Sequence, residues 1–588
     1  METKRKLKTI HNPARRNFFK TSVAATSAYV ITTKKSDAQV IIVPVLPPSP
    51  ATVPWVDELP VYLPKQATYL PDQPAVSGLI PPASGSPIDG ECGREVHHAW
   101  DQFPPQKFYE IHVRDDVPHK YHRDYPNQYI WGYDGITPGP TFHARYGEPI
   151  VVRVHNDLPF NAQGPGSPEI STHLHNLHTP SASDGFPGNY YSKSKSGPTL
   201  TAPGGFQDHH YPNVYAGVEA LGNGIGDPRE ALGTLWYHDH RFDFTAPNVL
   251  RGLAGLYLLF DDIDSGNELD RARTALRLPS GQYDVPIIFA DVRFDSGGYV
   301  FWDQLSPEGV LGDKVIVNGK IEPVFRVAKR KYRFRLLNGG PTRFYEFYLV
   351  TAGNVAQLFT YIANDGNLLP APLLNQTRVR LGVAERADII VDFSGYPLGT
   401  ELYVVNRLRQ DDTRGPKDVR APGTRLMKII VDREFPEGDM SQVPNELRPL
   451  RSPTAAEIAA APVRRFEFAR KNGLWTVNDQ LFNVNSPRVK VKKGSAEIWE
   501  LVNPSGGWSH PVHIHFEEGH IISRTRDGVS VAVPAHEKGR KDVYVLGPSS
   551  SLRVFLRFRD FTGKYVMHCH NTVHEDHAMM LRWDIEDN

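Results

Sequence analysis

Ten of the 24 histidines fall within four short motifs, and the neutral imidazole is the commonest metal ligand among side chains. The motifs are His173-Leu174-His175, His238-Asp239-His240, His510-Pro511-Val512-His513-Ile514-His515 and His568-Cys569-His570-Asn571-Thr572-Val573-His574. On a β-strand alternate side chains point to the same face, so the two imidazoles of a His-x-His unit can bind one metal ion or a close pair. The spacing therefore predicts metal binding by strands.

Cys569 gives the last motif a second role. In His568-Cys569-His570 the two imidazoles face one site while the thiol faces another, so a single strand carries two metal centres joined by a few covalent bonds. That is a short path for electrons. A thiolate, two imidazoles and a weak thioether form a trigonal blue-copper site. Cys569, His510, His574 and a following methionine, Met579 or Met580, supply this set.

The remaining eight histidines form four His-x-His units without structural cysteines, which suits copper better than a closed zinc site. A single unit of this kind is commonly plain surface polarity. All four motifs in one chain favour metal binding. Other histidines fit none of the motifs and are expected to be surface or structural residues, among them His97, His98, His119, His122, His209 and His210.

Composition excludes several classes of protein. The 588 residues suggest three or four domains. Lys+Arg and Asp+Glu are both 66, so we expect no nucleic-acid partner and no polybasic membrane anchor. No apolar run approaches 18 residues, so no membrane span is expected. Two cysteines exclude a disulfide scaffold, and with Cys569 committed to a metal we expect Cys92 to be free and buried.

The N-terminus has features of an export signal. Arg15-Arg16-Asn17-Phe18-Phe19-Lys20 resembles the bacterial twin-arginine motif, and an apolar stretch and a small-residue cleavage site follow it. We therefore expect 1–40 to be a signal segment and the protein to be periplasmic or extracellular. The alternative is a disordered basic tail. The proline-rich residues 41–90 predict an extended strap, pinned to a domain by residues such as Leu59 and Leu63.

The body is predicted to be all-β. Short runs with period two, such as 108–113, 150–154, 285–290 and 551–556, are bounded by turn residues and are typical of sandwich strands. One helix is expected at 454–461. Polar runs at 261–273 and 432–462 divide the body, which predicts a first domain with the strap at 41–265, a second at 266–440 and a third with its linker at 441–588.

The four metal motifs resemble those of the multicopper oxidases and occur in that family's order. Further stretches are similar to the group that contains the bacterial spore-coat laccase, bilirubin oxidase and phenoxazinone synthase, namely 121–126, 131–135, 138–141, 236–240 and 574–577. The resemblance covers the chain from about Trp55 to the C-terminus and is weak in the middle. It implies three consecutive cupredoxin-like Greek-key β-sandwich domains.

The resemblance also implies a ligand set for four copper ions. Type 1 copper matches His510, Cys569 and His574, with Met579 as axial ligand and Met580 as its rival. Type 2 copper matches His173 and His513. The pair of type 3 coppers matches His175, His238, His240, His515, His568 and His570. The trinuclear cluster is thus expected between the first and last domains. Where many relatives have glycine after the second histidine, this chain has Asn176, which tolerates left-handed φ.

The implied activity is that of a laccase or bilirubin oxidase. Single electrons enter at type 1 copper and pass through Cys569 to His568 or His570, and four of them reduce one dioxygen to two waters at the cluster. Protons are needed, and Asp184 and Glu575 match the family's acidic relay positions. The alternative for Asp184 is a turn before Gly185. We expect dioxygen and a small aromatic donor as partners and a monomeric protein.

The donor is the open question. Trp508 matches a tryptophan at the type 1 rim of bilirubin oxidase, where an exposed indole would stack on a phenolic, aromatic amine or tetrapyrrole donor. The alternative is a buried tryptophan beside the copper. Only six methionines are present, against the methionine-rich segments of cuprous oxidases. A cuprous or ferrous oxidase and an electron-transfer protein without turnover are the alternative functions. A copper nitrite reductase would need no type 3 ligands.

Overall fold

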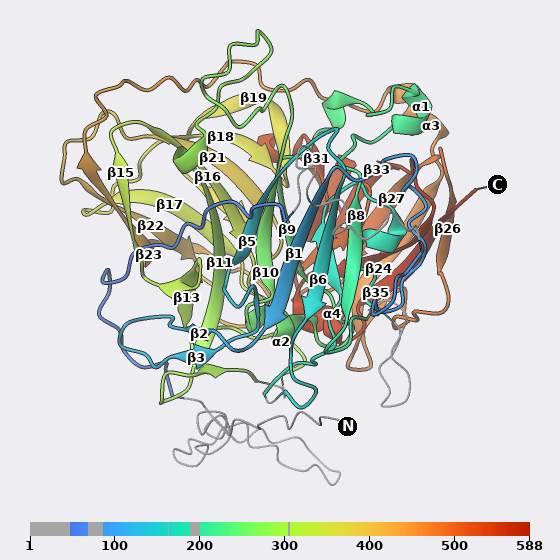
Figure 1. Ribbon diagram of the computed structural model, residues 1–588, viewed down its shortest axis with the longest axis horizontal. Coiled ribbons are helices and arrows are strands. Elements are labelled where there is room, and N and C mark those ends of the chain that lie inside the picture. The colour runs from blue at the N-terminus through green and yellow to red at the C-terminus, as the bar shows by residue number, and fades with distance from the viewer. Residues whose placement is uncertain (1–46, 69–85, 163, 189–199, 304–305, 588) are drawn as a thin grey trace, which may run out of the picture.

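The computed structural model describes residues 47–68, 86–162, 164–188, 200–303 and 306–587. The signal segment predicted at 1–40 lies outside the described residues, as does part of the predicted strap. Strands far outweigh helices in the described chain, which confirms the predicted all-β class (Figure 1). Within this part of the chain, no helix has the length and apolar character needed to cross a membrane.

Three consecutive stretches of chain each form a pair of packed sheets, called the first, second and third units below. In the first unit, one sheet has the order β4 (Gly132–Tyr133), β1 (Lys107–Arg114), β6 (Ile150–Asn156), β8 (Phe206–Tyr211), and the other β5 (Gly139–Arg145), β10 (Ala254–Phe260), β9 (Thr234–Asp239), β7 (Thr172–His175). A small hairpin, β2 (Pro118–His119) and β3 (Gln128–Tyr129), lies apart from them.

The second unit has two larger sheets. One has the order β14 (Lys320–Ile321), β13 (Lys314–Val317), β11 (Asp284–Phe294), β16 (Lys331–Asn338), β21 (Arg386–Asp392), β18 (Phe359–Asn364), β19 (Asn367–Gln376), with β12 (Val300–Phe301) paired to β11. The other has the order β15 (Val324–Ala328), β23 (Val419–Arg433), β22 (Glu401–Leu408), β17 (Tyr345–Thr351), β20 (Val379–Leu381).

The third unit completes the body. Its first sheet has the order β25 (Leu474–Val477), β24 (Val463–Lys471), β27 (Ala496–Asn503), β33 (Ser550–Arg557), β29 (Gly519–Arg526), β30 (Val529–Val531), with β31 (Arg540–Lys541) paired to β29. Its second has the order β26 (Val489–Lys492), β35 (Met580–Glu586), β34 (Gly563–Cys569), β28 (His510–Ile514), β32 (Val543–Leu546). Each predicted domain range contains one pair of sheets, and the exact boundaries stay predictions.

The same strand plan recurs in all three units. In each, the first strand runs parallel to a later strand of its own sheet, as β1 with β6, β11 with β16 and β24 with β27. In the partner sheet the last strand runs parallel to an earlier one, as β10 with β5, β23 with β15 and β35 with β26. The remaining pairings within these sheets are antiparallel. Chain crossing between two packed sheets in this way is a Greek-key β-sandwich, as predicted.

Period-two patterning creates the cores. On β24 the buried Phe466 and Phe468 alternate with the more exposed Arg465, Glu467 and Ala469. The two phenylalanines join a cluster that contains Trp499 and Trp583, both 0 % exposed. Such alternation gives each sheet one face for a hydrophobic core.

Helices are few and short: α1 (Val218–Leu221), α2 (Thr245–Leu250), α3 (Ala455–Ala460) and α4 (Thr572–Asp576). The helix predicted at 454–461 is α3, and it begins with a capping box in which Thr454 and Glu457 exchange hydrogen bonds. Helix α2 of the first unit lies next to α4 of the third. The carboxylate of Asp576 on α4 accepts hydrogen bonds from the amides of Thr245 and Ala246 on α2.

The described part of the strap links the first two units. Leu59 is 7 % exposed and packs in the core of the second unit, and its amide donates to the carbonyl of Val324. The amide of Lys65 then donates to Thr141 in the first unit. Leu63 is 87 % exposed, so the prediction that it would pin the strap is wrong.

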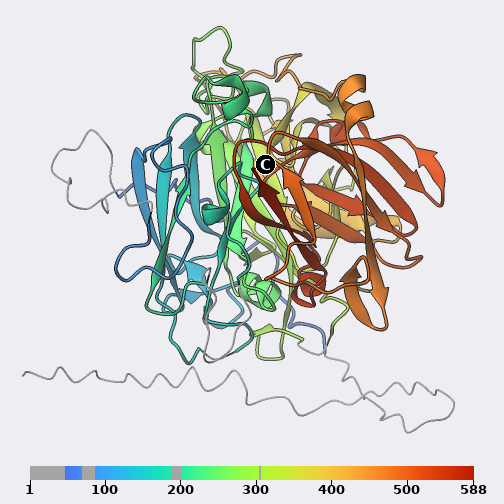
Figure 2. The ribbon, with the colours of Figure 1, turned by 90° about the vertical axis from the view of Figure 1, so that its right-hand side faces the viewer.

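Figure 2 shows the first unit in blue to green and the third in orange to red, side by side and in contact. Asp560 of the third unit makes one of these contacts. It accepts hydrogen bonds from His178 Nε2 at 2.7 Å and from the amides of Gly217 and Glu219 at 2.6 and 2.9 Å, all in the first unit. Burial alone would raise the pKa of Asp560, but these donors lower it to about 2.

A carboxylate with a depressed pKa stabilises the folded state at neutral pH, and the contribution disappears as pH falls through the folded pKa. Asp560→Asn should therefore lower the free energy of unfolding by about 2 kcal/mol at pH 7. The difference from the parent should shrink as pH falls from about 4 to about 2. Denaturant unfolding at several pH values measures it. Asp262→Asn, at a side chain 94 % exposed, is the matched control. An equal loss at pH 7 and pH 3 would contradict the assignment.

Candidate metal centres

The predicted ligands come together from the two ends of the body. In the first unit, His173 on β7 pairs in register with His238 on β9. In the third unit, His513 on β28 pairs with His568 on β34. These two strand pairs face each other across the contact between the units. All ten motif histidines and Cys569 are buried, with none more than 1 % exposed.

Cys569 lies in a site of its own with two histidines. Its Sγ is 3.5 Å from His510 Nδ1 and 3.6 Å from His574 Nδ1. The opposite nitrogen of His574, Nε2, donates to the carbonyl of Glu308 at 3.1 Å, which leaves Nδ1 free to bind a metal. Burial raises the pKa of the Cys569 thiol, so the thiolate needs a cation beside it. One sulfur and two nitrogens in this arrangement fit a trigonal copper site.

The neighbouring methionines lie on different sides of the sheet. Met579 packs in the same apolar cluster as Cys569 and Trp508, whereas Met580 packs with Phe186 and Val566 in another. The main chain also links Met579 to this site, because the amide of Cys569 donates to its carbonyl at 3.0 Å. This geometry favours Met579 over Met580 as a thioether neighbour of the sulfur.

Three histidines form a nearly regular triangle. The Nε2 atoms of His240, His515 and His568 are each 3.2 Å from the other two. The centre of such a triangle lies about 2 Å from each nitrogen, which is a metal–imidazole bond length. Their Nδ1 atoms face outward to carboxylates: Glu575 lies 3.2 Å from His240 and 3.1 Å from His568, and Asp184 lies 2.8 Å from His515.

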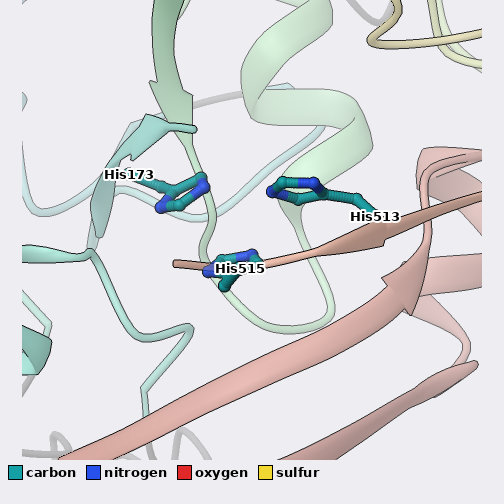
Figure 3. A group of neighbouring side chains, drawn as sticks. All are labelled: His173, His513 and His515. Carbon is teal, nitrogen blue, oxygen red and sulfur yellow. The ribbon is translucent and has the colours of Figure 1, made fainter. Parts of the chain in front are cut away.

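The other five histidines of the four His-x-His units surround this triangle. These eight histidines together are called the cluster histidines below. Figure 3 shows His173 of the first unit beside His513 and His515 of the third, and ligand nitrogens of these three lie within 4.8 Å of one another. His175, His238 and His570 form a second group, with ring centroids 5.3 to 5.8 Å apart. Burial, together with neighbouring histidines in most cases, lowers the pKa of these imidazoles and keeps them neutral, the form that binds metal.

Buried ring nitrogens without a hydrogen-bond partner mark the same space. Among the described residues, His173 Nε2, His175 Nδ1, His238 Nε2, His513 Nε2 and both nitrogens of His570 have none. An unpaired buried polar atom is costly, and a bound metal ion would supply the missing partner. The donor set of neutral imidazoles around a common space fits the copper cluster that the sequence predicts.

Asp184 and Glu575, predicted from sequence as proton-relay residues, both contact the histidine cluster. Burial raises the pKa of Asp184. Burial also acts to raise the pKa of Glu575, but His568 and His240 lower it to about 2. Asp184 is held against the ligand strand by Gly185, whose φ is +84° and where any Cβ would lie within 2.5 Å of His173 Cα. The turn before Gly185 and the contact with the cluster therefore coexist.

Asn176 takes the conformation expected of it. Its φ is +80°, in the left-handed region, and its side chain donates to the carbonyl of Asp365 in the second unit at 3.1 Å. Asparagine adopts this region more readily than most residues, so the departure from glycine is accommodated.

Trp508 is buried rather than exposed, with 9 % of its surface accessible, so the structure favours the alternative of a buried tryptophan beside the thiol site. Its ring packs edge-on against Trp475 at 4.9 Å, and the guanidinium of Arg414 lies 5.3 Å from it. Trp475 was missed by the sequence analysis. It stacks on His574 with ring centroids 3.7 Å apart, and its indole nitrogen donates to the carbonyl of Pro307.

Asp542 was also missed, although its carboxylate lies 3.4 Å from His175 Nε2 and its carbonyl accepts from His513 Nδ1 at 3.0 Å. No spacing in the sequence relates it to a histidine motif. Cys92 is free, as predicted, but half-buried rather than buried. Of the histidines outside the motifs, His97, His122, His209 and His210 are buried and His98 is exposed.

Known proteins resemble this chain along most of its length. Sequence models of the multicopper oxidase family match residues 118–201 and 448–588. Bilirubin oxidase of Albifimbria verrucaria is 33 % identical over 485 residues, 81 % of this chain and 76 % of that protein. A laccase of Bacillus subtilis (strain 168) is 30 % identical over 534 residues, 83 % of this chain and 96 % of that protein.

Solved structures share the fold. The crystal structure of a laccase from Pediococcus acidilactici has a TM-score of 0.67 at 24 % sequence identity, covering 92 % of this chain and 95 % of that one. The multicopper oxidase McoA from Aquifex aeolicus has a TM-score of 0.65 at 24 % identity, covering 82 % and 97 %.

Proposed function

The chain belongs to the multicopper oxidase family, and from that premise we propose that it takes single electrons from small aromatic donors at a thiolate copper site and delivers them to dioxygen at a histidine-bound cluster. One observation carries the proposal. Cys569 faces two histidines of one site, while its chain neighbours His568 and His570 face another. The two sites are therefore joined by covalent bonds of a single strand.

We assign four copper ions to these sites. Type 1 copper would be held by His510, Cys569 and His574, with the thioether of Met579 as a weaker fourth ligand, and type 2 copper by His173 and His513. The triangle of nitrogens supports His240, His515 and His568 as ligands of one type 3 copper, and the ring distances support His175, His238 and His570 for the other. When bound, the ions supply one-electron transfer and the reduction of dioxygen to water.

The side chains around the cluster control protons. Dioxygen reduction consumes protons, so acidic groups within hydrogen-bond reach of the cluster are needed. Among the residues the structure describes, Asp184 hydrogen-bonds to Nδ1 of His515, and the carboxylate of Glu575 lies 3.2 Å from Nδ1 of His240 and 3.1 Å from Nδ1 of His568. We assign both as proton relays. Glu575 also fixes the rings of His240 and His568 with Nε2 inward.

Aromatic organic donors are favoured over metal ions. The side chains that cover Trp508 include two cationic groups, Arg414 at 5.3 Å and Arg470 at 5.7 Å from the ring. Arg470 is paired with the carboxylate of Glu308, so the positive charge of Arg414 is what disfavours cuprous and ferrous ions and suits phenolic or carboxylated donors. Trp508 and Trp475 form a continuous aromatic path from this surface to the ligand His574. The metal-ion oxidase stays the alternative function.

We also propose that the protein is exported and that it is a monomer. The twin-arginine motif at Arg15-Arg16 supports export to the periplasm or the extracellular space.

Removing the thiolate tests the function directly. Cys569→Ser should bind one copper ion fewer than the parent and lose the blue colour, because serine lacks the soft sulfur ligand. Oxygen uptake with an aromatic donor should stop, since electrons can no longer enter. Copper per chain, the visible spectrum and an oxygen electrode measure these effects. Cys92→Ser is the control and should keep all three. A copper-loaded blue parent that consumes no oxygen would leave only an electron-transfer protein.

The proton-relay assignment makes a separate prediction. Asp184→Asn and Glu575→Gln keep the shape of each side chain, but an amide cannot accept and pass on a proton, so the turnover number should fall by roughly 100-fold or more. Reduction of the type 1 copper by donor without oxygen should stay at the parent rate. Bleaching of the blue colour under anaerobic stopped flow measures it. If bleaching slows as much as turnover does, the two residues act on donor oxidation and the assignment is wrong.

A donor panel identifies the substrate class. Oxygen uptake with bilirubin, simple phenols and aminophenols should exceed that with cuprous or ferrous ions. Trp508→Ala should raise KM for the aromatic donors by up to roughly 10-fold, because it removes the buried ring that supports Arg414 and Arg470 at the surface, and it should leave the metal ions unchanged. Fastest uptake with a metal ion would favour the alternative function instead.

A further inference from the structure

The second unit supplies none of the assigned ligands, yet Arg386 at the start of its strand β21 reaches the space between the other two units. The side chain is 0 % exposed. Its Nη1 and Nη2 donate to the two oxygens of Asp542 in the third unit at 2.8 and 2.6 Å. Its Nε donates at 3.2 Å to the carbonyl of Thr234, where strand β9 of the first unit begins. One guanidinium therefore joins all three units.

Asp542 carries this contact into the histidine cluster. Its Oδ1 lies 3.4 Å from Nε2 of His175, and its main-chain carbonyl accepts from Nδ1 of His513 at 3.0 Å. The rings of His175 and His513 stack on each other with centroids 3.7 Å apart. A shift of Asp542 would therefore move one histidine assigned to type 3 copper and one assigned to type 2.

The ion pair also determines which nitrogen His175 presents. Both oxygens of Asp542 accept from the guanidinium of Arg386, so Oδ1 faces Nε2 of His175 as an acceptor and that nitrogen carries the hydrogen. The lone pair is then on Nδ1, which has no partner among the described residues. His173, His238 and His513 present the other nitrogen. Their Nδ1 atoms face main-chain carbonyls, so their Nε2 atoms are the ones available to bind a metal.

We propose that Arg386 is a positioning residue for the copper cluster: through Asp542 it fixes the ring of His175 with Nδ1 toward the metal and holds His513 beside it. The proposal rests on the proposed function, because it concerns the same cluster. It explains why a buried arginine of the second unit extends to the ligands of the other two.

Holding the units together does not require Arg386. The adjacent Lys541 is also buried, and its Nζ donates to Asn364, Asp365 and Glu385 of the second unit at 2.6, 2.7 and 2.9 Å. These charge-assisted bonds anchor the same segment without touching a cluster histidine. Replacing Arg386 should therefore change the histidine cluster more than it changes the packing of the three units.

Arg335 offers a matched control. It belongs to strand β16 of the same unit, is 0 % exposed, and pairs through two nitrogens with Asp284 at 2.7 Å each. It also donates to the hydroxyl of Thr234 at 2.8 Å. Among the described residues its partner Asp284 contacts none of the cluster histidines, so Arg335→Lys disturbs a buried ion pair without reaching the metal.

The test compares Arg386→Lys, Asp542→Asn and Arg335→Lys as full chains loaded with copper. Lysine keeps the charge but cannot hold both carboxylate oxygens, and asparagine no longer dictates which nitrogen of His175 carries the hydrogen. Copper per chain by atomic absorption, the blue absorption of the Cys569 site and the electron paramagnetic resonance signal of the non-blue copper are measured. Thermal melting shows whether each variant folds.

We expect Arg386→Lys and Asp542→Asn to lose at least half of the non-blue copper or to change its resonance signal, with the blue absorption kept. Arg335→Lys should match the parent in both signals even where its melting temperature falls. Full non-blue copper with an unchanged signal in either cluster variant would overturn the proposal. So would equal changes in the Arg335→Lys control. A parent without blue copper would instead refute the proposed function.

Discussion

The arrangement of the whole molecule depends on burying neutral imidazoles face to face. Eight cluster histidines lie at no more than 1 % exposure, where burial lowers the pKa of almost all of them and keeps the rings uncharged. Each ring has two nitrogens, and a buried nitrogen without a partner costs free energy. In most of the rings the protein binds one nitrogen, through Asp184, Glu575, Asp542 or a carbonyl, and leaves the other for a metal. The ligands must then come from two units, because one strand pair can surround only half of the space.

Strand geometry turns this constraint into a pathway. Side chains of β34 alternate between the faces of their sheet, so the thiol of Cys569 joins the core around Met579 while His568 joins the triangle of nitrogens. The same alternation separates Met579 from Met580. The two proposed metal sites, with their different ligands, are thus held at a fixed separation by a covalent chain, which no movement of the units can change. The properties of the proposed thiolate site and of the proposed histidine-bound cluster can therefore be adjusted independently, each by the side chains around it.

Sequence reasoning succeeded where the signal was local. The His-x-His spacing, the thiolate between two imidazoles and the alternating strands all lie within a few residues of chain, and the all-β class followed from them. It failed where partners are distant in sequence. Trp475 is 99 residues from the His574 on which it stacks, and Asp542 is 367 residues from His175. Trp508 was open to two interpretations because the cover over it, Arg414, comes from another unit. Such contacts exist only once the units have packed.

The middle unit shows how a repeated fold can change its task. Its strands β17 and β22 occupy the places that β7 and β9 hold in the first unit and β28 and β34 in the third, next to the last strand of the same sheet. They carry no histidine, and their paired positions include Phe347 opposite Asn406. The unit nevertheless contacts the thiol site, through the Glu308 carbonyl at His574, and the region of the cluster, through Arg386. The middle unit supplies no assigned ligand, and its loops and edges instead contact residues at the proposed sites of the other two units. The middle unit can therefore contribute to the proposed chemistry although its sequence resembles the family only weakly. Main-chain carbonyls and a single arginine do not form a recognisable sequence motif.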